Sequence, residues 1–111
     1  MAETFNKDFR GFQKALSEHI TIFEYRQIRY KINFSVVMFY SREPIDFSDM
    51  LHFLRKSDRY IPLHDQLVAF VLDNCDEESG IKTSSKLLTH IQAHFFQKEV
   101  YSAVVTAENY S

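Results

Sequence analysis

The chain has 111 residues, of which 45% are hydrophobic and 15% aromatic, so it can bury the core of one small domain. A formal net charge of -2 gives no global attraction to nucleic acid or to an anionic membrane surface. Because only two glycines are present, a Gly-rich loop that wraps its backbone around a phosphate is excluded.

The cellular location is suggested by features near the N-terminus and by cysteine content. The single cysteine, Cys75, cannot form an internal disulfide. The first residues mix acids and bases and lack the apolar centre of a signal peptide. No apolar run approaches the roughly 18 residues of a membrane span. We therefore expect a cytoplasmic protein that does not enter a membrane.

A long amphipathic helix is predicted at the start of the chain. Apolar residues recur every three or four positions from Phe5 to Phe23, and this period predicts a helix that runs to about Tyr30. We assign residues 1–33 to this helix and residues 34–111 to one compact domain. The aromatic face of the helix either folds back on the open face of a sheet or binds a protein partner or a second copy.

The middle of the chain predicts a strand, a short helix and a hairpin. Residues 34–40, FSVVMFY, are β-branched and aromatic and apolar on both faces, as in a buried strand. A short helix follows, which Asp46 or Ser48 can cap. Residues 60–63 and 67–72 then pair as a hairpin across a three-residue turn.

The last third predicts a second helix and a final strand. The acidic loop at residues 73–78 suits the positive end of a helix that carries Leu87, Leu88, Ile91 and Phe95 on its inner face. Residues 101–107 form the last strand. The order β-α-β-β-α-β, after the leading helix, predicts an α+β fold of the ferredoxin-like split βαβ type. This is an antiparallel sheet with two helices on one face.

Three stretches carry a resemblance to a known family. RYKINFSVVMF at 29–39 resembles the run that enters and crosses the first core strand of the GGDEF domain, the diguanylate cyclase family. LRKSDRYIPLHDQLVAFVL at 54–72 matches without a gap the helix end, strand, signature turn and next strand of that family. DNCDEESGIKTSSKLLTHIQAHF, from residue 73, is similar to its acidic loop and last long helix. The chain thus resembles a degenerate, truncated GGDEF domain.

The signature turn of the family is replaced in this chain. The five signature positions hold His64, Asp65, Gln66, Leu67 and Val68. His64 and Asp65 occupy the places of the two glycines that let substrate approach the turn backbone. Gln66 and Leu67 occupy the places of the acid pair.

The second source of metal-binding carboxylates is also missing. The first-strand aspartates of the family fall near Tyr40 and Arg42, and the segment between Tyr40 and Asp58 is much shorter than in the family. Transfer of a nucleotide phosphoryl group requires metal ions held by carboxylates. The resemblance therefore implies a protein that is not an enzyme, with no catalytic residues, no metal and no cofactor.

One binding motif of the family keeps its spacing. The resemblance places Arg55 and Asp58 at the Arg-x-x-Asp site that binds the product, cyclic di-GMP, five residues before the signature turn. A guanidinium can bind a guanine edge or a phosphate, and a carboxylate can accept from guanine N–H groups. Arg59 adjoins the pair and can add a phosphate contact. The alternative is that Arg55 and Asp58 form only a local ion pair at a helix end.

We therefore expect a non-catalytic signalling or regulatory module of a bacterial type, which senses cyclic di-GMP through Arg55, Asp58 and Arg59. The alternative is a protein-interaction or dimerisation adaptor that needs no nucleotide and associates through its N-terminal helix. Nucleic acid and membrane are not expected partners, since neither the charge nor the strands carry the patterns that such partners require.

Overall fold

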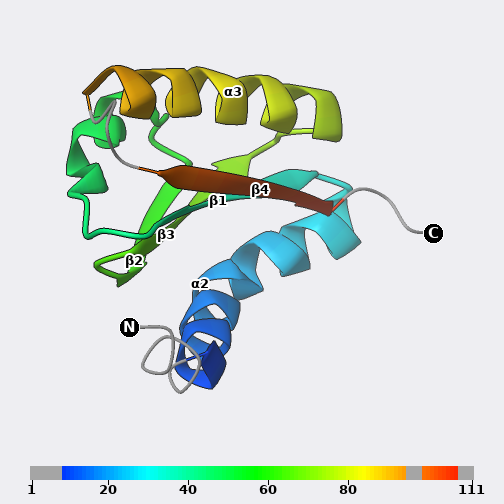
Figure 1. Cartoon of the computed structure of the whole chain (residues 1–111). Helices are drawn as coiled ribbons and strands as arrows, with labels where there is room; N and C mark the ends of the chain where they lie inside the picture. Colours follow the sequence, from blue (N-terminus) through cyan, green and yellow to red (C-terminus); the bar gives the residue numbers. More distant parts are fainter. Residues whose placement is uncertain (1–8, 95–98, 108–111) are drawn as a thin grey trace.

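The computed structural model describes residues 9–94 and 99–107, and among these the side chains of all but Phe9, Arg10, Phe12, His94 and Ala107. Figure 1 shows the arrangement of the helices and strands. In chain order they are α2 (Phe9–Tyr30), β1 (Phe34–Ser41), η1 (Phe47–Phe53), β2 (Arg59–His64), β3 (Leu67–Asp73), α3 (Glu77–His94) and β4 (Val100–Ala107).

The four strands form one antiparallel sheet in the order β2-β3-β1-β4. The two central strands, β1 and β3, consist mostly of buried apolar residues, as the sequence predicted for them. In the register between these strands, Val37 lies opposite Phe70 and Phe39 lies opposite Val68. The predicted α+β class and antiparallel sheet are confirmed.

One face of the sheet is covered by α3 (Figure 1). Leu87 and Ile91 of this helix are fully buried against Val37 and Phe39 of β1 and Phe70 of β3. At Gly80 the helix lies close to β1, because a Cβ at this position would come within 2.7 Å of the Ser35 hydroxyl. The inner face that the apolar period predicted is confirmed for Leu87, Leu88 and Ile91, whereas Phe95 lies outside the described residues.

The opposite face of the sheet is covered in part by α2, which contacts β2 and β3 (Figure 1). Phe23 is 3% exposed and packs with Phe34 and Val36 of β1 and Ile61 of β2. The leading helix thus folds back on the sheet, which is one of the two interpretations of its apolar face. The side chains of Phe5, Phe9 and Phe12, which the sequence placed on that face, lie outside the described residues.

The short helix between β1 and β2 is a 3-10 helix. Asp46 caps it by accepting a hydrogen bond from the Ser48 backbone N–H at 2.9 Å. Phe47 and Met50 are buried in the same cluster as α3, so η1 covers the same side of the sheet as that helix. No helix within the described ranges is long and apolar enough to cross a membrane.

Candidate functional site

The loop between η1 and β2 folds around Asp58. The Asp58 backbone N–H donates to the Arg55 carbonyl at 3.0 Å, and the Arg55 backbone N–H donates to Asp58 Oδ2 at 2.8 Å. The turn is therefore closed by one main-chain bond and by one side-chain bond in the opposite direction. This reciprocal arrangement explains why an aspartate three residues after Arg55 fits this turn.

Asp58 also connects this loop to the end of β3. Its Oδ1 accepts from the Asp73 backbone N–H at 2.9 Å, and the Asp73 carbonyl accepts from Arg55 Nη2. The Arg55 guanidinium completes the set by donating to Oδ2 at 3.4 Å and to Oδ1 at 3.3 Å. Each carboxylate oxygen of Asp58 thus accepts two hydrogen bonds from groups of the chain itself.

Burial differs between the two residues of the motif. The Asp58 side chain is 3% exposed, whereas the Arg55 side chain is 59% exposed. A buried carboxylate is stable only where donors replace the water that it loses. The backbone N–H groups of Arg55 and Asp73 and the Arg55 guanidinium supply those donors, which makes Asp58 part of the interior and leaves Arg55 at the surface.

The Asp73 side chain connects this set of hydrogen-bonded residues to the N-terminal helix. Its Oδ1 accepts from Arg26 Nη1 of α2 at 2.9 Å, and the two side chains are 8% and 33% exposed. Asp73 therefore contacts the loop through its main chain and α2 through its carboxylate. This role of Asp73 was not predicted, although an acid at the end of a seven-residue strand that is otherwise apolar was a signal for it in the sequence.

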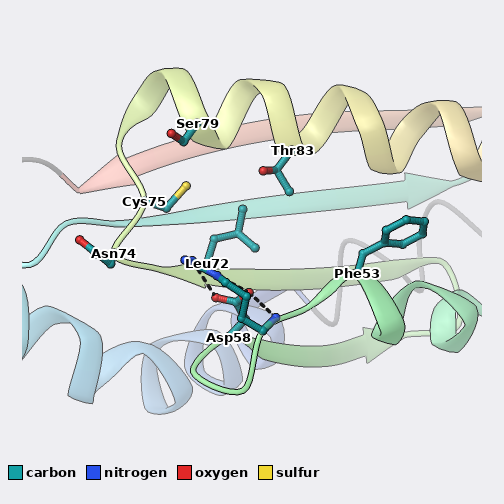
Figure 2. A pocket seen from close by; sticks show the side chains of 8 residues that line it. Phe53, Asp58, Leu72, Asn74, Cys75, Ser79 and Thr83 are labelled. Carbon is teal, nitrogen blue, oxygen red and sulfur yellow. Dashed lines mark hydrogen bonds and ion pairs between the residues drawn. The ribbon is translucent and has the colours of Figure 1, made fainter.

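A cavity of about 260 Å³ lies beside this loop (Figure 2). Ser79 and Thr83 border it from α3, Asn74 and Cys75 from the turn that follows β3, and Phe53 from η1. Arg55, Asp58 and Leu72 complete the lining.

The chemistry of the cavity is that of hydrogen bonding rather than of nucleophilic attack. Burial raises the pKa of the Cys75 thiol, so this group stays protonated near neutral pH. Ser79, Thr83 and Asn74 provide neutral donors and acceptors, and Arg55 provides a cation. The arrangement can hold a small polar or anionic group.

The third residue predicted for this site lies elsewhere. Arg59 is the first residue of β2, is exposed, and is not among the described residues that line the cavity. The structure thus brings together Arg55 and Asp58 of the predicted binding site but does not place Arg59 in the same cavity.

The residues that the sequence analysis compared with a signature turn, 64–68, lie at the other end of the β2–β3 hairpin. Gln66 is 3% exposed, and its side-chain amide donates to the carbonyls of Ser41 at 3.2 Å and Arg42 at 2.8 Å. His64 Nδ1 accepts from the Gln66 backbone N–H at 3.2 Å. Leu67 is buried as well. Gln66 thus joins the hairpin turn to the end of β1.

The other residues that the sequence singled out at this end of the hairpin are either buried in the core, exposed at the turn or in contact with β4 and the residue before it. Val68 is 1% exposed within the core, and Asp65 is exposed at the tip of the turn. Tyr40 stacks on Tyr101 with ring centroids 6.3 Å apart. Arg42 forms an exposed ion pair with Glu99 at 3.3 Å.

Metal-ligating side chains do not gather within the described part of the chain. There, no group of three or more His, Cys, Asp or Glu residues is close enough together to hold a metal ion. A second cavity, of about 340 Å³, lies beside the turn and is bordered by Asp46, Tyr60, His64 and Asp65 together with prolines and apolar residues. The Asp46 carboxylate accepts from Ser48, which lowers the pKa of Asp46.

The chain matches no known protein-family model, and no curated protein resembles it significantly.

Proposed function

We propose that the protein is a non-catalytic interaction module that needs no nucleotide, and that its resemblance to the GGDEF domain is one of scaffold. The observation that carries this proposal is the state of Asp58. Its two carboxylate oxygens accept four hydrogen bonds from the chain, and its side chain is 3% exposed. A guanine could bind this carboxylate only by displacing donors that the chain already supplies, and each buried donor left without its acceptor costs about 1–3 kcal/mol.

We also propose that the fold is of the ferredoxin-like split βαβ type, and the arrangement of the strands supports this assignment. The strand order β2-β3-β1-β4 with every neighbouring pair antiparallel is compatible with a ferredoxin-like split βαβ. In this assignment the 3-10 helix η1 takes the place of the first crossover helix, and α3 forms the second.

The proposed absence of catalysis follows from the residues at the signature turn. Gln66 and Leu67 stand where an acid pair would have to hold divalent ions, and neither side chain carries a negative charge. The Gln66 amide is directed to the carbonyls of Ser41 and Arg42, so its N–H groups stabilise the turn.

Surface composition supports interaction with a protein. Large apolar side chains on α2 are exposed although the helix packs on the sheet, and they are Ile22 at 54%, Tyr25 at 51%, Ile28 at 71% and Tyr30 at 59%. Exposed apolar side chains on one helix are a common feature of protein interfaces. A protein partner or a second copy of the chain is the class of ligand that fits such a surface.

A second candidate function is sensing of cyclic di-GMP, and one observation favours it. The Arg55 guanidinium is 59% exposed beside a cavity of about 260 Å³ with polar side chains on its wall. In this candidate Arg55 would bind a phosphate or the O6/N7 edge of guanine, and Asp58 would position Arg55 without contacting the ligand.

Titration calorimetry of the full chain with cyclic di-GMP separates the two candidates. We expect no saturable heat up to about 1 mM ligand, where binding would contribute at least roughly 4 kcal/mol. Arg55→Ala and Lys56→Ala form a matched pair, because both side chains are exposed cations on the same loop. Saturable binding that Arg55→Ala abolishes and Lys56→Ala preserves would establish nucleotide sensing and reject the nucleotide-independent function.

A further inference from the structure

The two edges of the sheet differ in how they are protected against pairing with another strand. The outer strand β2 contains Arg59 and Pro62 and has a register shift between Pro62 and His64. Charges, prolines and bulges of this kind are the usual means of blocking an edge. The other outer strand, β4, has the sequence VYSAVVTA, without a charged residue, proline or glycine. Its outer edge is therefore chemically suited to accept another strand.

One face of β4 also carries uncovered apolar side chains. Tyr101 is 57% exposed and Val105 is 66% exposed. In the register of β4 with β1, Val105 lies opposite Val36, which belongs to the cluster on the α2 side of the sheet. The main contacts of α2 are with β2 and β3, and the exposure of Tyr101 and Val105 shows that the β4 side of this face is largely open among the described residues. The open backbone edge and the open apolar face thus belong to the same strand.

The geometry of antiparallel pairing limits how two β4 strands can meet. Successive residues in such a strand direct their N–H and C=O groups alternately to its two sides. Two copies related by a two-fold axis can therefore form hydrogen bonds only if the axis passes between a residue and the same residue of the other copy. An axis at Ala103 places Tyr101 of each copy opposite Val105 of the other, and Ser102 opposite Val104.

In this register the side chains of the two copies fit each other, and no like charges meet. Ala103 is small and exposed, so its two copies can face each other on the axis without a clash. Each Tyr101–Val105 pair is an aromatic and β-branched combination, which is favourable across antiparallel strands. Since β4 has no charged side chain, the two-fold axis brings no like charges together.

We propose that β4 binds a second copy of this chain, with Ala103 on the two-fold axis, so that the two sheets join into one of eight strands. This inference rests on the proposed function as an interaction module and names its partner. It places the interface on β4, whereas the exposed apolar residues of α2 would place it on the N-terminal helix.

Light scattering of the full chain over a range of concentrations tests the partner and the surface. The expected mass is twice the 13.2 kDa of one chain, and Val105→Lys should weaken self-association by about tenfold or more. The matched control is Ile28→Lys, which removes a similarly exposed apolar side chain from α2 and should leave the mass unchanged. A chain that stays monomeric, or one that Ile28→Lys dissociates and Val105→Lys does not, would overturn the inference.

Disulfide cross-linking tests the register without relying on stability. A residue on the axis faces its own copy with Cα atoms about 5 Å apart, within the range of a disulfide. Ala103→Cys should therefore cross-link two chains under mild oxidation. Ser102→Cys and Val104→Cys should not, because their own copies are about 8 Å away in this register. Faster cross-linking at Ser102 or Val104 would reject Ala103 as the axis, and the native Cys75 is buried and does not interfere.

Different measurements test the β4 pairing and the proposed function. A strictly monomeric chain overturns the β4 pairing and leaves nucleotide-independent binding of another protein intact. Saturable binding of cyclic di-GMP through Arg55 overturns the proposed function, and the measured mass of the chain is independent of that result.

Discussion

The two ends of the β2–β3 hairpin differ in the chemistry that holds them. At one end the buried carboxylate of Asp58 accepts from backbone N–H groups of Arg55 and Asp73. At the other end the buried amide of Gln66 donates to the carbonyls of Ser41 and Arg42. The resemblance noted in the sequence predicts a product site at one of these ends and a signature turn at the other, and in this chain both ends direct their polar groups toward the protein.

The difference lies in the charge that each end has to bury. Asp58 requires several donors, among them a guanidinium, because an ionised carboxylate loses far more hydration than a neutral amide. Gln66 needs only two carbonyls, which the end of β1 provides. Loss of the side chain should therefore be more costly at the Asp58 end.

The largest expected effect is that of Asp58→Ala. This substitution removes the acceptor of two backbone N–H groups and leaves the Arg55 guanidinium without its carboxylate partner, so we expect a loss of about 4 kcal/mol in the free energy of unfolding. Urea denaturation of the two proteins at neutral pH measures it.

The matched control for Asp58 is Lys56→Ala in the same loop. Lys56 is exposed, so its removal should change the stability by no more than about 0.5 kcal/mol. Equal stability of the Asp58→Ala protein and the parent chain would show that the hydrogen bonds of this carboxylate make no net contribution to folding. That result would remove the basis for interpreting Asp58 as a structural residue.

A smaller effect is expected from Gln66→Glu, which introduces an acid at the turn of the β2–β3 hairpin. The new carboxylate would face the carbonyls of Ser41 and Arg42 in place of an amide N–H donor, at a position 3% exposed. We expect a loss of about 2 kcal/mol at neutral pH. Gln66→Ala serves as the control, since it removes the donor without adding a charge.

The ranking of the two Gln66 variants is the informative result. If denaturation at neutral pH found Gln66→Glu more stable than Gln66→Ala, the turn would accommodate an acid, and the contrast between the two ends of the hairpin would be wrong.

Most of the fold could be predicted from the sequence because its signals are local. The period of three and four residues predicted the helix that ends at Tyr30, and the β-branched runs predicted β1 and β3. The 3-10 form of residues 47–53 was not predicted, because a segment of seven residues is too short for its period to distinguish the two helix types.

The candidate site was predicted less completely because its contacts are not local. Spacing alone brought Arg55 and Asp58 together. However, the Asp58 carboxylate accepts from Asp73, which is 15 residues away, and the Gln66 amide donates to Ser41, which is 25 residues away. Which partner a buried polar group finds is decided by how the strands pack, and no pattern in the sequence specified that.

The smallest expected effect concerns the carboxylate that caps α3 near the Asp58 end. Asp76 Oδ1 accepts from the Ser79 backbone N–H at 2.8 Å, and this hydrogen bond together with that of the Ser79 hydroxyl lowers the pKa of Asp76 below its usual 3.8. A carboxyl group whose pKa is lower in the folded state stabilises that state when it is ionised. The contribution is thus present above the unfolded value and is lost as the pH falls through the lowered one.

Asp76→Asn isolates this contribution, because asparagine caps a helix about as well as aspartate but does not titrate in this range. Between about pH 6 and pH 3, the urea midpoint of the parent chain should fall more steeply than that of the Asp76→Asn protein. At neutral pH the two midpoints should be close, since both side chains accept from the Ser79 N–H. Parallel curves over this range would mean that the ionisation of Asp76 is not linked to folding, and that α3 needs only the hydrogen bond of its cap and not the negative charge.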